Sequence, residues 1–241
     1  MYIKAIITIF IIIVILTTTI IVYNIVKFAQ SETRIIERKS KQGDYSVFEI
    51  LNLLSPKECD YVIEKAKEKG LSDSMVWSYV DEKGNDLDEK HRKSKQTWLS
   101  DDEIDVAMKL SNISTYLTNI PKENQELLQV AMYETFGKFN AHYDACAYSD
   151  VNVCNKMNKN AGQRRTTLIV YLNDNFIGGE TEFTKADILV KPKKGKGLLF
   201  WDTDSEEKIL DLSEHRGNEV RGGQKWICTK WSHARAYKDV M

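Results

Sequence analysis

Three side chains in the C-terminal half of the sequence have the types and spacing of a metal site. His142 and Asp144 are two residues apart, and His215 lies much further along the chain. On a strand, residues i and i+2 point to the same face, so an imidazole and a carboxylate there can address one point. Two histidines and one carboxylate on one face of an octahedron are the ligands of non-haem Fe(II) oxygenases. A His-x-Asp pair alone also occurs as a surface hydrogen bond or a helix cap. The residues around it must therefore distinguish a metal site from these alternatives.

A lysine ten residues after His215 adds to this pattern. It begins an alternating run whose residues on one face are Lys225, Ile227, Thr229 and Trp231. An ammonium group on the inward face of an apolar strand is costly to bury unless it meets an anion. The distal carboxylate of a 2-oxo dicarboxylate that chelates iron through its other end would meet this requirement. The alternative is a surface lysine whose charged end reaches solvent.

The elements that must position these residues change character along the chain. A helix is predicted over residues 56–69, because Ser55 is a suitable N-cap and Glu58 its capping-box partner. A second helix is predicted over residues 101–117, where three acidic residues favour the positive end of the helix dipole. The N-terminal part of the domain is therefore expected to be helical.

Short β-prone runs separated by turn residues follow the helices. They are residues 128–133, 166–172, 188–190, 197–201 and 226–231. Helices first and then many short strands predict an α+β fold with a sheet sandwich or barrel as its functional core.

Composition excludes several classes of protein. The 241 residues contain 34 Lys and Arg against 35 Asp and Glu, a net charge of −1, so nucleic acid is not an expected partner. With 42% hydrophobic residues, 12 Gly and 3 Pro, the chain is neither collagenous nor largely disordered. Four cysteines are too few for a disulfide-framework miniprotein.

An uncharged apolar run near the N-terminus predicts a membrane anchor. Residues 5–26 contain no charged side chain and as a helix would span roughly 33 Å, enough to cross a bilayer. A signal peptide and a buried soluble helix are the alternatives, and a signal peptide has a shorter apolar region of about 7–15 residues. The predicted organisation is an anchor over 1–27, a polar stalk over 28–45 and a catalytic domain over 46–241, whose oxygenase core spans about 125–235.

Several short segments, taken in chain order, carry a resemblance to a known family. They are residues 54–59, 92–99, 128–134, 142–144, 171–174, 178–183, 191–201 and 225–231. With these segments the chain resembles the prolyl 4-hydroxylase α-subunit type of Fe(II)/2-oxoglutarate dioxygenases over about residues 46–235. The resemblance implies a double-stranded β-helix, or jelly roll, with flanking N-terminal helices.

Roles for individual residues follow from the resemblance. It implies that His142, Asp144 and His215 bind Fe(II) and that Lys225 binds the distal carboxylate of 2-oxoglutarate. The implied reaction is C4 hydroxylation of a peptidyl proline with release of succinate and CO2, and L-ascorbate is the implied reductant. A proline-containing peptide is the implied substrate, while the oligomeric state stays open.

Other positions are less specific. Tyr133 and Thr167 stand where the family has supporting hydroxyls near the co-substrate, although a core tyrosine and an ordinary strand threonine are equally good interpretations. Around the distal ligand, Glu214 and residues 216–219 depart from the family pattern, as do residues 140–141 before the His-x-Asp pair. The substrate is therefore less well defined than the cofactor chemistry. Alternatives are a dioxygenase acting on another residue or a small molecule, and a non-enzymatic membrane-displayed binding module.

The long polar segment 145–163 is either a mobile substrate lid or a disordered insertion. Cys146 and Cys154 within it form a disulfide if the compartment is oxidising, or otherwise remain free thiols. Cys59 and Cys228 are expected to be small buried residues on a helix and a strand.

Two signals conflict on the compartment. Basic residues that follow the anchor would place the domain in the cytosol by the positive-inside rule. The family resemblance implies a protein of the secretory pathway, which favours the endoplasmic reticulum lumen. There Asn112-Ile113-Ser114 would be a glycosylation sequon. We expect a single-pass protein of the endoplasmic reticulum membrane with a lumenal domain.

Overall fold

The computed structural model describes residues 32–74, 92–147 and 151–237. Contacts divide the chain into two units at Arg34, and nearly all described residues belong to the second, Ile35–Met241. The membrane span predicted for residues 5–26 lies outside the described residues. Within the described ranges, no helix is both long enough and apolar enough to cross a bilayer.

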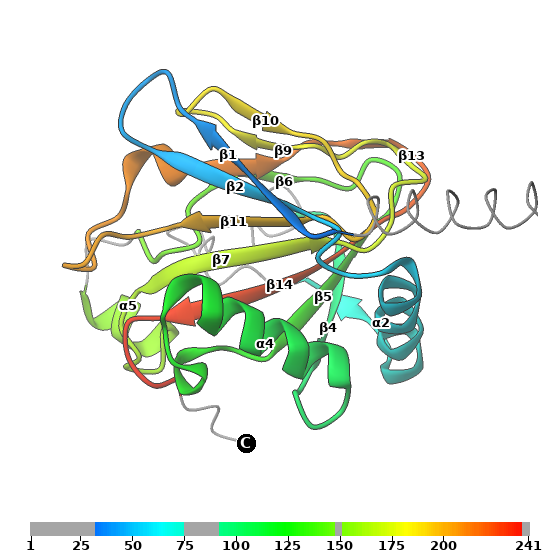
Figure 1. The fold of residues 1–241 in the computed structure, drawn as a ribbon, viewed down its shortest axis with the longest axis horizontal. Coiled ribbons are helices and arrows are strands. Elements are labelled where there is room, and N and C mark those ends of the chain that lie inside the picture. The colour runs from blue at the N-terminus through cyan, green and yellow to red at the C-terminus, as the bar shows by residue number, and fades with distance from the viewer. Residues whose placement is uncertain (1–31, 75–91, 148–150, 238–241) are drawn as a thin grey trace, which may run out of the picture. The chain divides into compact units, whose positions relative to one another are not determined.

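An eight-stranded sheet with the order β1-β2-β11-β7-β14-β5-β4-β3 is the largest element (Figure 1). Its strands in chain order are β1 (Arg34–Lys39), β2 (Ser46–Leu51), β3 (Ser72–Asp73), β4 (Lys95–Leu99), β5 (Leu128–Tyr133), β7 (Arg164–Tyr171), β11 (Gly197–Trp201) and β14 (Lys225–His233). The pairings from β2 to β3 along this order are all antiparallel. The strand order brings distant segments side by side, with β14 between β5 and β7.

A smaller sheet with the order β10-β9-β12-β6 lies against one face of the large sheet (Figure 1). Its strands are β6 (Phe139–His142), β9 (Thr181–Phe183), β10 (Ile188–Val190) and β12 (His215–Gly217). A short pair of strands, β8 (Ile177–Gly178) and β13 (Val220–Gly222), accompanies it. The two stacked antiparallel sheets agree with the predicted jelly-roll core.

The space between the sheets is filled by every second residue of their strands. Ile169 and Tyr171 of β7, with Leu198 and Phe200 of β11, are buried there with Phe183 of β9. Such alternation is the signature of a strand that is buried on both faces but against different partners. This inner layer surrounds the residues predicted to carry the chemistry.

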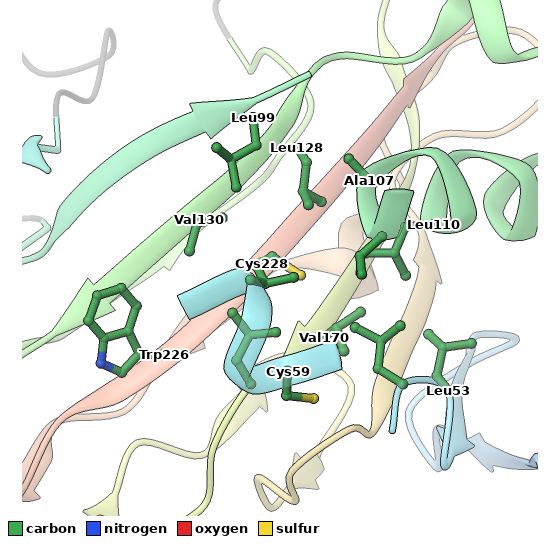
Figure 2. Close-up of a cluster of buried hydrophobic side chains, with 14 of the residues drawn as sticks. Leu53, Cys59, Leu99, Ala107, Leu110, Leu128, Val130, Val170, Trp226 and Cys228 are labelled. Carbon is green, nitrogen blue, oxygen red and sulfur yellow. The ribbon is translucent and has the colours of Figure 1, made fainter. Parts of the chain in front are cut away.

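The other face of the large sheet packs against the helices α2 (Pro56–Lys69) and α4 (Asp105–Thr118). Figure 2 shows this second core, in which Leu110 of α4 belongs to the same cluster as Leu128, Val130, Val170 and Cys228 of the sheet. Burial of these side chains stabilises the scaffold by roughly 1.5–3 kcal/mol for each large apolar residue. The helices thus fix the large sheet from outside without contributing to its inner face.

Helix α2 confirms the predicted capping. The Ser55 hydroxyl accepts a hydrogen bond from the Glu58 N–H, the Glu58 carboxylate accepts one from the Ser55 N–H, and the helix ends before Gly70. The prediction for the second helix was wrong at its start. Residues 101–103 form a turn, because Glu103 bonds back to Ser100 through both its side chain and its N–H, and α4 begins only at Asp105.

The folded region also begins earlier than the predicted stalk allowed. Strand β1 lies within residues 28–45, and Tyr45 is part of the inner core. Arg38 of β1 forms an ion pair with the buried Glu49 of β2, with Nε and Oε1 2.7 Å apart. The side chains of β1 are all exposed, so it has no apolar alternation from which a strand could be predicted.

Segment 145–163 has structure of its own. It contains the short helix α5 (Val151–Met157) and a disulfide between Cys146 and Cys154. Cys59 and Cys228 are free and buried, which confirms their predicted character. The remaining short elements are the 3₁₀ turns η1 (Lys122–Asn124) and η2 (Asp211–Ser213).

Candidate metal centre and its surroundings

Three predicted ligands come together between the two sheets. His142 ends β6 and His215 begins β12, and the two residues are direct partners across this strand pair. Asp144 follows two residues after His142, with its Oδ1 3.6 Å from His142 Nε2 and its Oδ2 3.8 Å from His215 Nε2. One ligand atom from each residue lies within 4.8 Å of the others. Their side chains are between 5% and 11% exposed, so the cluster is nearly closed to solvent.

Both imidazoles are oriented by main-chain carbonyl groups. His142 Nδ1 lies 2.7 Å from the Asn140 oxygen, and His215 Nδ1 lies 3.0 Å from the Ser213 oxygen. A carbonyl oxygen only accepts, so each Nδ1 carries a hydrogen, and in the neutral imidazole Nε2 is then the nitrogen with the free lone pair. Metal-binding histidines are commonly oriented in this way.

The protonation states of Asp144 and His215 suit a metal cation. Burial raises the pKa of Asp144, but the interactions with His142 and His215 outweigh it and hold that pKa well below its ordinary value. Burial, assisted by the neighbouring His142, lowers the pKa of His215 to about 4. An anionic carboxylate beside a neutral imidazole is the form in which these groups bind metal. The donor set fits Fe(II), with two nitrogens and one carboxylate.

Aromatic rings enclose the two histidines. The Phe139 ring stacks on His142 with ring centroids 3.5 Å apart, and Phe200 meets His215 edge-on at 4.9 Å. Phe183 approaches His215 from another side, at 5.5 Å. These contacts restrict the imidazoles to one orientation and exclude water around them.

Lys225 lies on the inward face of β14, as the alternation predicted, and is only 3% exposed. Its Nζ is 5.3 Å from the centre of the Tyr133 ring and 5.8 Å from that of Tyr171. Within the described part of the chain no salt bridge to Lys225 is formed. Burial lowers the pKa of Lys225 to about 8, against a small opposing effect of Glu180. A buried ammonium without a carboxylate partner fits an anionic group of a ligand.

The two predicted hydroxyl residues occupy different places. Tyr133 is the direct partner of Lys225 across β5 and β14, so it lies beside the lysine. The Thr167 hydroxyl instead lies 2.7 Å from Asp144 Oδ2 and 2.8 Å from Asp202 Oδ2, next to the histidine cluster. The structure therefore associates Thr167 with the candidate metal ligands.

Thr181 was missed as a site residue, although it lies in the quoted segment 178–183. Its hydroxyl accepts a 2.7 Å hydrogen bond from the Tyr171 hydroxyl, and the Tyr171 ring faces Lys225. Thr181 is 4% exposed. Its place in the Gly-Gly-Glu-Thr motif was the signal that could have identified it.

An ion cluster behind Asp144 was also missed. Arg164 donates to both carboxylate oxygens of Glu126, at 2.6 and 3.1 Å, and its Nη1 donates to the Asp144 main-chain oxygen at 3.3 Å. His233 Nε2 lies 2.8 Å from the same Glu126 carboxylate. Burial opposes ionisation of Glu126, yet Arg164 and His233 lower its pKa to about 2. The cluster joins residues far apart in sequence, so no local pattern reveals it.

A group of polar and aromatic side chains continues from this cluster along β14, β5 and β4, and Trp98 and Arg164 are its partly exposed members. The Trp231 ring packs under the Arg164 guanidinium at 3.9 Å and lies 5.9 Å from the Trp98 ring. Beside them, Arg92 donates to Gln129 at 3.0 Å, and both of these side chains are buried. We call Trp98, Gln129, Arg164 and Trp231 the aromatic shelf.

The unusual residue before His215 has partners of its own. Glu214 accepts a 2.6 Å hydrogen bond from the Thr184 hydroxyl and lies 3.5 Å from Lys185 Nζ. Lys185 also donates to Tyr143, the residue between His142 and Asp144. This rim of polar contacts ties together the two segments that supply the candidate ligands.

Comparisons with known proteins agree with this geometry. Residues 128–233 match the family model of the 2OG-Fe(II) oxygenase superfamily. Prolyl 4-hydroxylase 5 of Arabidopsis thaliana is 35% identical over 208 residues, which cover 78% of this chain and 68% of the relative. A protein of Acanthamoeba polyphaga mimivirus, described as a prolyl 4-hydroxylase, is 33% identical over 191 residues. The aligned part covers 79% of this chain and 75% of the viral protein.

A solved structure is similar as well. The viral collagen prolyl hydroxylase of Paramecium bursaria Chlorella virus-1, determined as a 2-oxoglutarate complex, is 33% identical. The superposition covers 78% of this chain and 96% of the viral protein with a TM-score of 0.62.

Proposed function

This chain belongs to the prolyl 4-hydroxylase family of Fe(II)/2-oxoglutarate dioxygenases, and on that premise we propose that it hydroxylates peptidyl proline at C4, releasing succinate and CO2. One observation carries the proposal. Two imidazoles and one ionised carboxylate lie together between the two sheets, and a buried lysine that forms no salt bridge among the described residues faces the same interior. This arrangement offers a cation site and an anion site on the inner side of the sheets, as an Fe(II) and 2-oxoglutarate enzyme requires.

Each residue has a distinct task in this proposal. His142, Asp144 and His215 bind Fe(II), while Lys225 pairs with the distal carboxylate of 2-oxoglutarate and Tyr133 borders that end. When bound, iron and 2-oxoglutarate supply the oxidising chemistry. The protein fixes the orientation of the imidazoles through the carbonyls of residues 140 and 213, and its aromatic side chains exclude water.

The aromatic shelf suits a proline-containing substrate. Proline-rich segments adopt an extended polyproline helix that docks on aromatic surfaces with little loss of conformational entropy. Trp98 is partly exposed there and packs on the buried Trp231, and Arg164 connects the aromatic pair directly to the Asp144 main chain. We therefore place the peptide along β4, β5 and β14.

The decisive experiment is turnover on a panel of proline-containing peptides with Fe(II), 2-oxoglutarate and O2. Succinate formation should accompany the addition of one oxygen atom to the peptide, located at proline C4 by amino-acid analysis. Succinate formation without modified proline would instead indicate another residue or a small molecule as the target. A different target would agree with the polar contacts that Glu214 makes at the rim, where the sequence departs from the family pattern.

L-Ascorbate completes the proposed cofactor set. The support is the family resemblance alone, in which ascorbate would be the reductant for 2-oxoglutarate turnover that is not coupled to substrate. Activity in long incubations should decline without ascorbate and be sustained with it. An equal time course in both conditions would remove ascorbate from the set.

Location in the endoplasmic reticulum membrane, with a lumenal domain, is proposed on three grounds. Residues 5–26 have the length and apolarity of an anchor. The disulfide between Cys146 and Cys154 is typical of an oxidising compartment, and Asn112 of the sequon is exposed on α4. Protease protection of the domain in intact microsomes would support this topology, whereas digestion without detergent would place the domain in the cytosol.

A further inference from the structure

A buried carboxyl group next to the candidate ligands has no task in the reaction described so far. Asp202 directly follows β11 and is 0% exposed. Its Oδ2 lies 2.8 Å from the Thr167 hydroxyl, and its Oδ1 is buried without a hydrogen-bond partner. Among the described residues, no lysine, arginine or histidine forms an ion pair with Asp202. An ionised carboxylate would be costly in such a place.

Counting hydrogens constrains the three groups. The Thr167 hydroxyl has one hydrogen and lies between two carboxyl oxygens, 2.7 Å from Asp144 Oδ2 and 2.8 Å from Asp202 Oδ2. If both carboxyl groups were ionised, one of these short contacts would join two acceptors with no hydrogen between them. One of the two carboxyl groups therefore carries a proton.

The surroundings decide which carboxyl group it is. Asp144 is the proposed carboxylate ligand, and a carboxylate binds a metal in its ionised form. Asp202 is not a candidate ligand. The positive charge of Arg164 lowers the pKa of Asp202 somewhat, but Arg164 forms hydrogen bonds with both carboxylate oxygens of Glu126 instead. Burial and then the negative charge of Asp144 raise the pKa of Asp202 well above its ordinary value.

We propose that Asp202 is a positioning residue for the iron site: as a neutral acid it donates to the Thr167 hydroxyl, which in turn donates to Asp144 Oδ2. This relay holds Oδ2 of Asp144, which lies 3.8 Å from His215 Nε2, and so fixes the carboxylate with its Oδ1 3.6 Å from His142 Nε2. A carboxylate held in this orientation would be ready to bind the metal, as hydrogen-bonded ligands in metal sites are. The inference rests on the proposed Fe(II) site and extends it to two residues outside the ligand set.

Substitutions at Asp202 test the direction of the hydrogen bond. Asp202→Asn keeps a donor of similar shape that cannot ionise, so Fe(II) affinity should stay within about threefold of the wild type. Asp202→Ala removes the donor, and Fe(II) affinity should fall about 10–100-fold, the usual effect of losing a partner of a metal ligand. Affinity is measured by anaerobic Fe(II) titration of the full chain, both calorimetrically and through the visible charge-transfer band with 2-oxoglutarate.

Thr167→Val provides a second variant, nearly equal in size to the wild type and without the hydroxyl. It should weaken Fe(II) binding as Asp202→Ala does, and melting of the metal-free variants separates this effect from loss of stability. In the wild-type holoenzyme, infrared spectra should contain the carbonyl stretch of a protonated carboxylic acid, which Asp202→Asn removes.

Two results would overturn the relay. Equal loss of Fe(II) affinity in Asp202→Asn and Asp202→Ala would mean that the charge of Asp202 is needed, and unchanged affinity in Asp202→Ala would mean that it positions nothing. Neither readout involves proline. A wild-type protein that binds Fe(II) and 2-oxoglutarate but leaves every peptide unmodified would refute the proposed substrate while leaving the relay testable.

Discussion

His142 and His215 lie directly opposite each other on β6 and β12, with their ring centroids 4.4 Å apart. The geometry of the candidate centre is therefore set by the register of two short antiparallel strands. A one-residue shift of either strand would turn one imidazole to the outer face of the small sheet. The register becomes irregular immediately after His215, before Gly217, so the regular pairing extends no further than the histidines.

Replacing His142 with alanine should abolish turnover without unfolding the protein. The substitution removes one of three ligands, while the inner core of the two sheets keeps its own packing. Fe(II) titration should show no charge-transfer band with 2-oxoglutarate, and circular dichroism should be unchanged. Tyr143→Phe is the matched control, because Tyr143 is adjacent in sequence but bonds to Asp211 and Lys185 at the rim. Turnover retained in His142→Ala would remove this residue from the ligand set.

The inward position of Lys225 was predictable from sequence because strand alternation is a local property. Ile227 and Trp231 mark one face of β14, and Lys225 falls in phase with both. The N-cap of α2 was predictable for a similar reason, since Ser55 and Glu58 are only three residues apart. Patterns that operate within a few residues were thus sufficient for these elements.

Contacts between distant segments could not be predicted in this way. Arg164 reaches the Asp144 main chain only because β7 lies next to β14 and Glu126 fixes its guanidinium. Asp202 directly follows β11, where no local pattern marks it as a site residue, yet the fold buries it completely beside Thr167. The residues that surround the candidate ligands are thus determined by strand order, which one sequence does not reveal.

Lys225→Ala should mainly weaken binding of 2-oxoglutarate. Removing one member of a buried charge pair costs about 2–5 kcal/mol, which corresponds to at least about a thirtyfold rise in the apparent KM. The KM for peptide should change much less, because Lys225 is not one of the residues of the aromatic shelf. Steady-state kinetics with each reactant varied in turn check this split. An unchanged apparent affinity for 2-oxoglutarate would exclude the assigned role.

The pH dependence of 2-oxoglutarate binding follows from the lowered pKa of Lys225. Its folded-state pKa is about 8, so the ammonium is charged below that pH and loses its proton as the pH rises through it. Affinity for the anionic co-substrate should therefore be highest below about pH 8 and decline above it, approaching about tenfold per pH unit at most. Lys225→Arg is the control, because arginine stays charged throughout this range. Parallel profiles for the wild type and Lys225→Arg would contradict the prediction.

Trp98→Ala should weaken the peptide substrate alone. Trp98 is half-buried and packs on Trp231 at the aromatic shelf, where loss of an aromatic contact costs about 0.5–1.5 kcal/mol. The KM for a proline-containing peptide should rise about two- to tenfold while the KM for 2-oxoglutarate stays constant. Trp98→Phe keeps an aromatic ring and should recover much of the loss. A rise in both KM values would indicate a general disturbance of the cavity.

Truncation in the outer core should reduce stability without changing the chemistry. Leu110 of α4 is fully buried against the large sheet (Figure 2), so Leu110→Ala should lower the free energy of unfolding by about 2–5 kcal/mol. Tyr116 lies on the same helix and is 87% exposed, so Tyr116→Ala should change it by no more than about 0.5 kcal/mol. Denaturant unfolding measures both. Comparable losses in the two variants would contradict the assignment of α4 to this core.

The disulfide near the candidate centre should stabilise the protein measurably. It closes the short loop from Cys146 to Cys154, and removing such a closure costs roughly 2–3 kcal/mol. Reductant should therefore lower the melting temperature of the wild type. The double variant Cys146→Ala/Cys154→Ala should melt at the temperature of the reduced protein and show no further change with reductant, because Cys59 and Cys228 are already free thiols. If reductant shifts the double variant as much as the wild type, the stabilisation has another source.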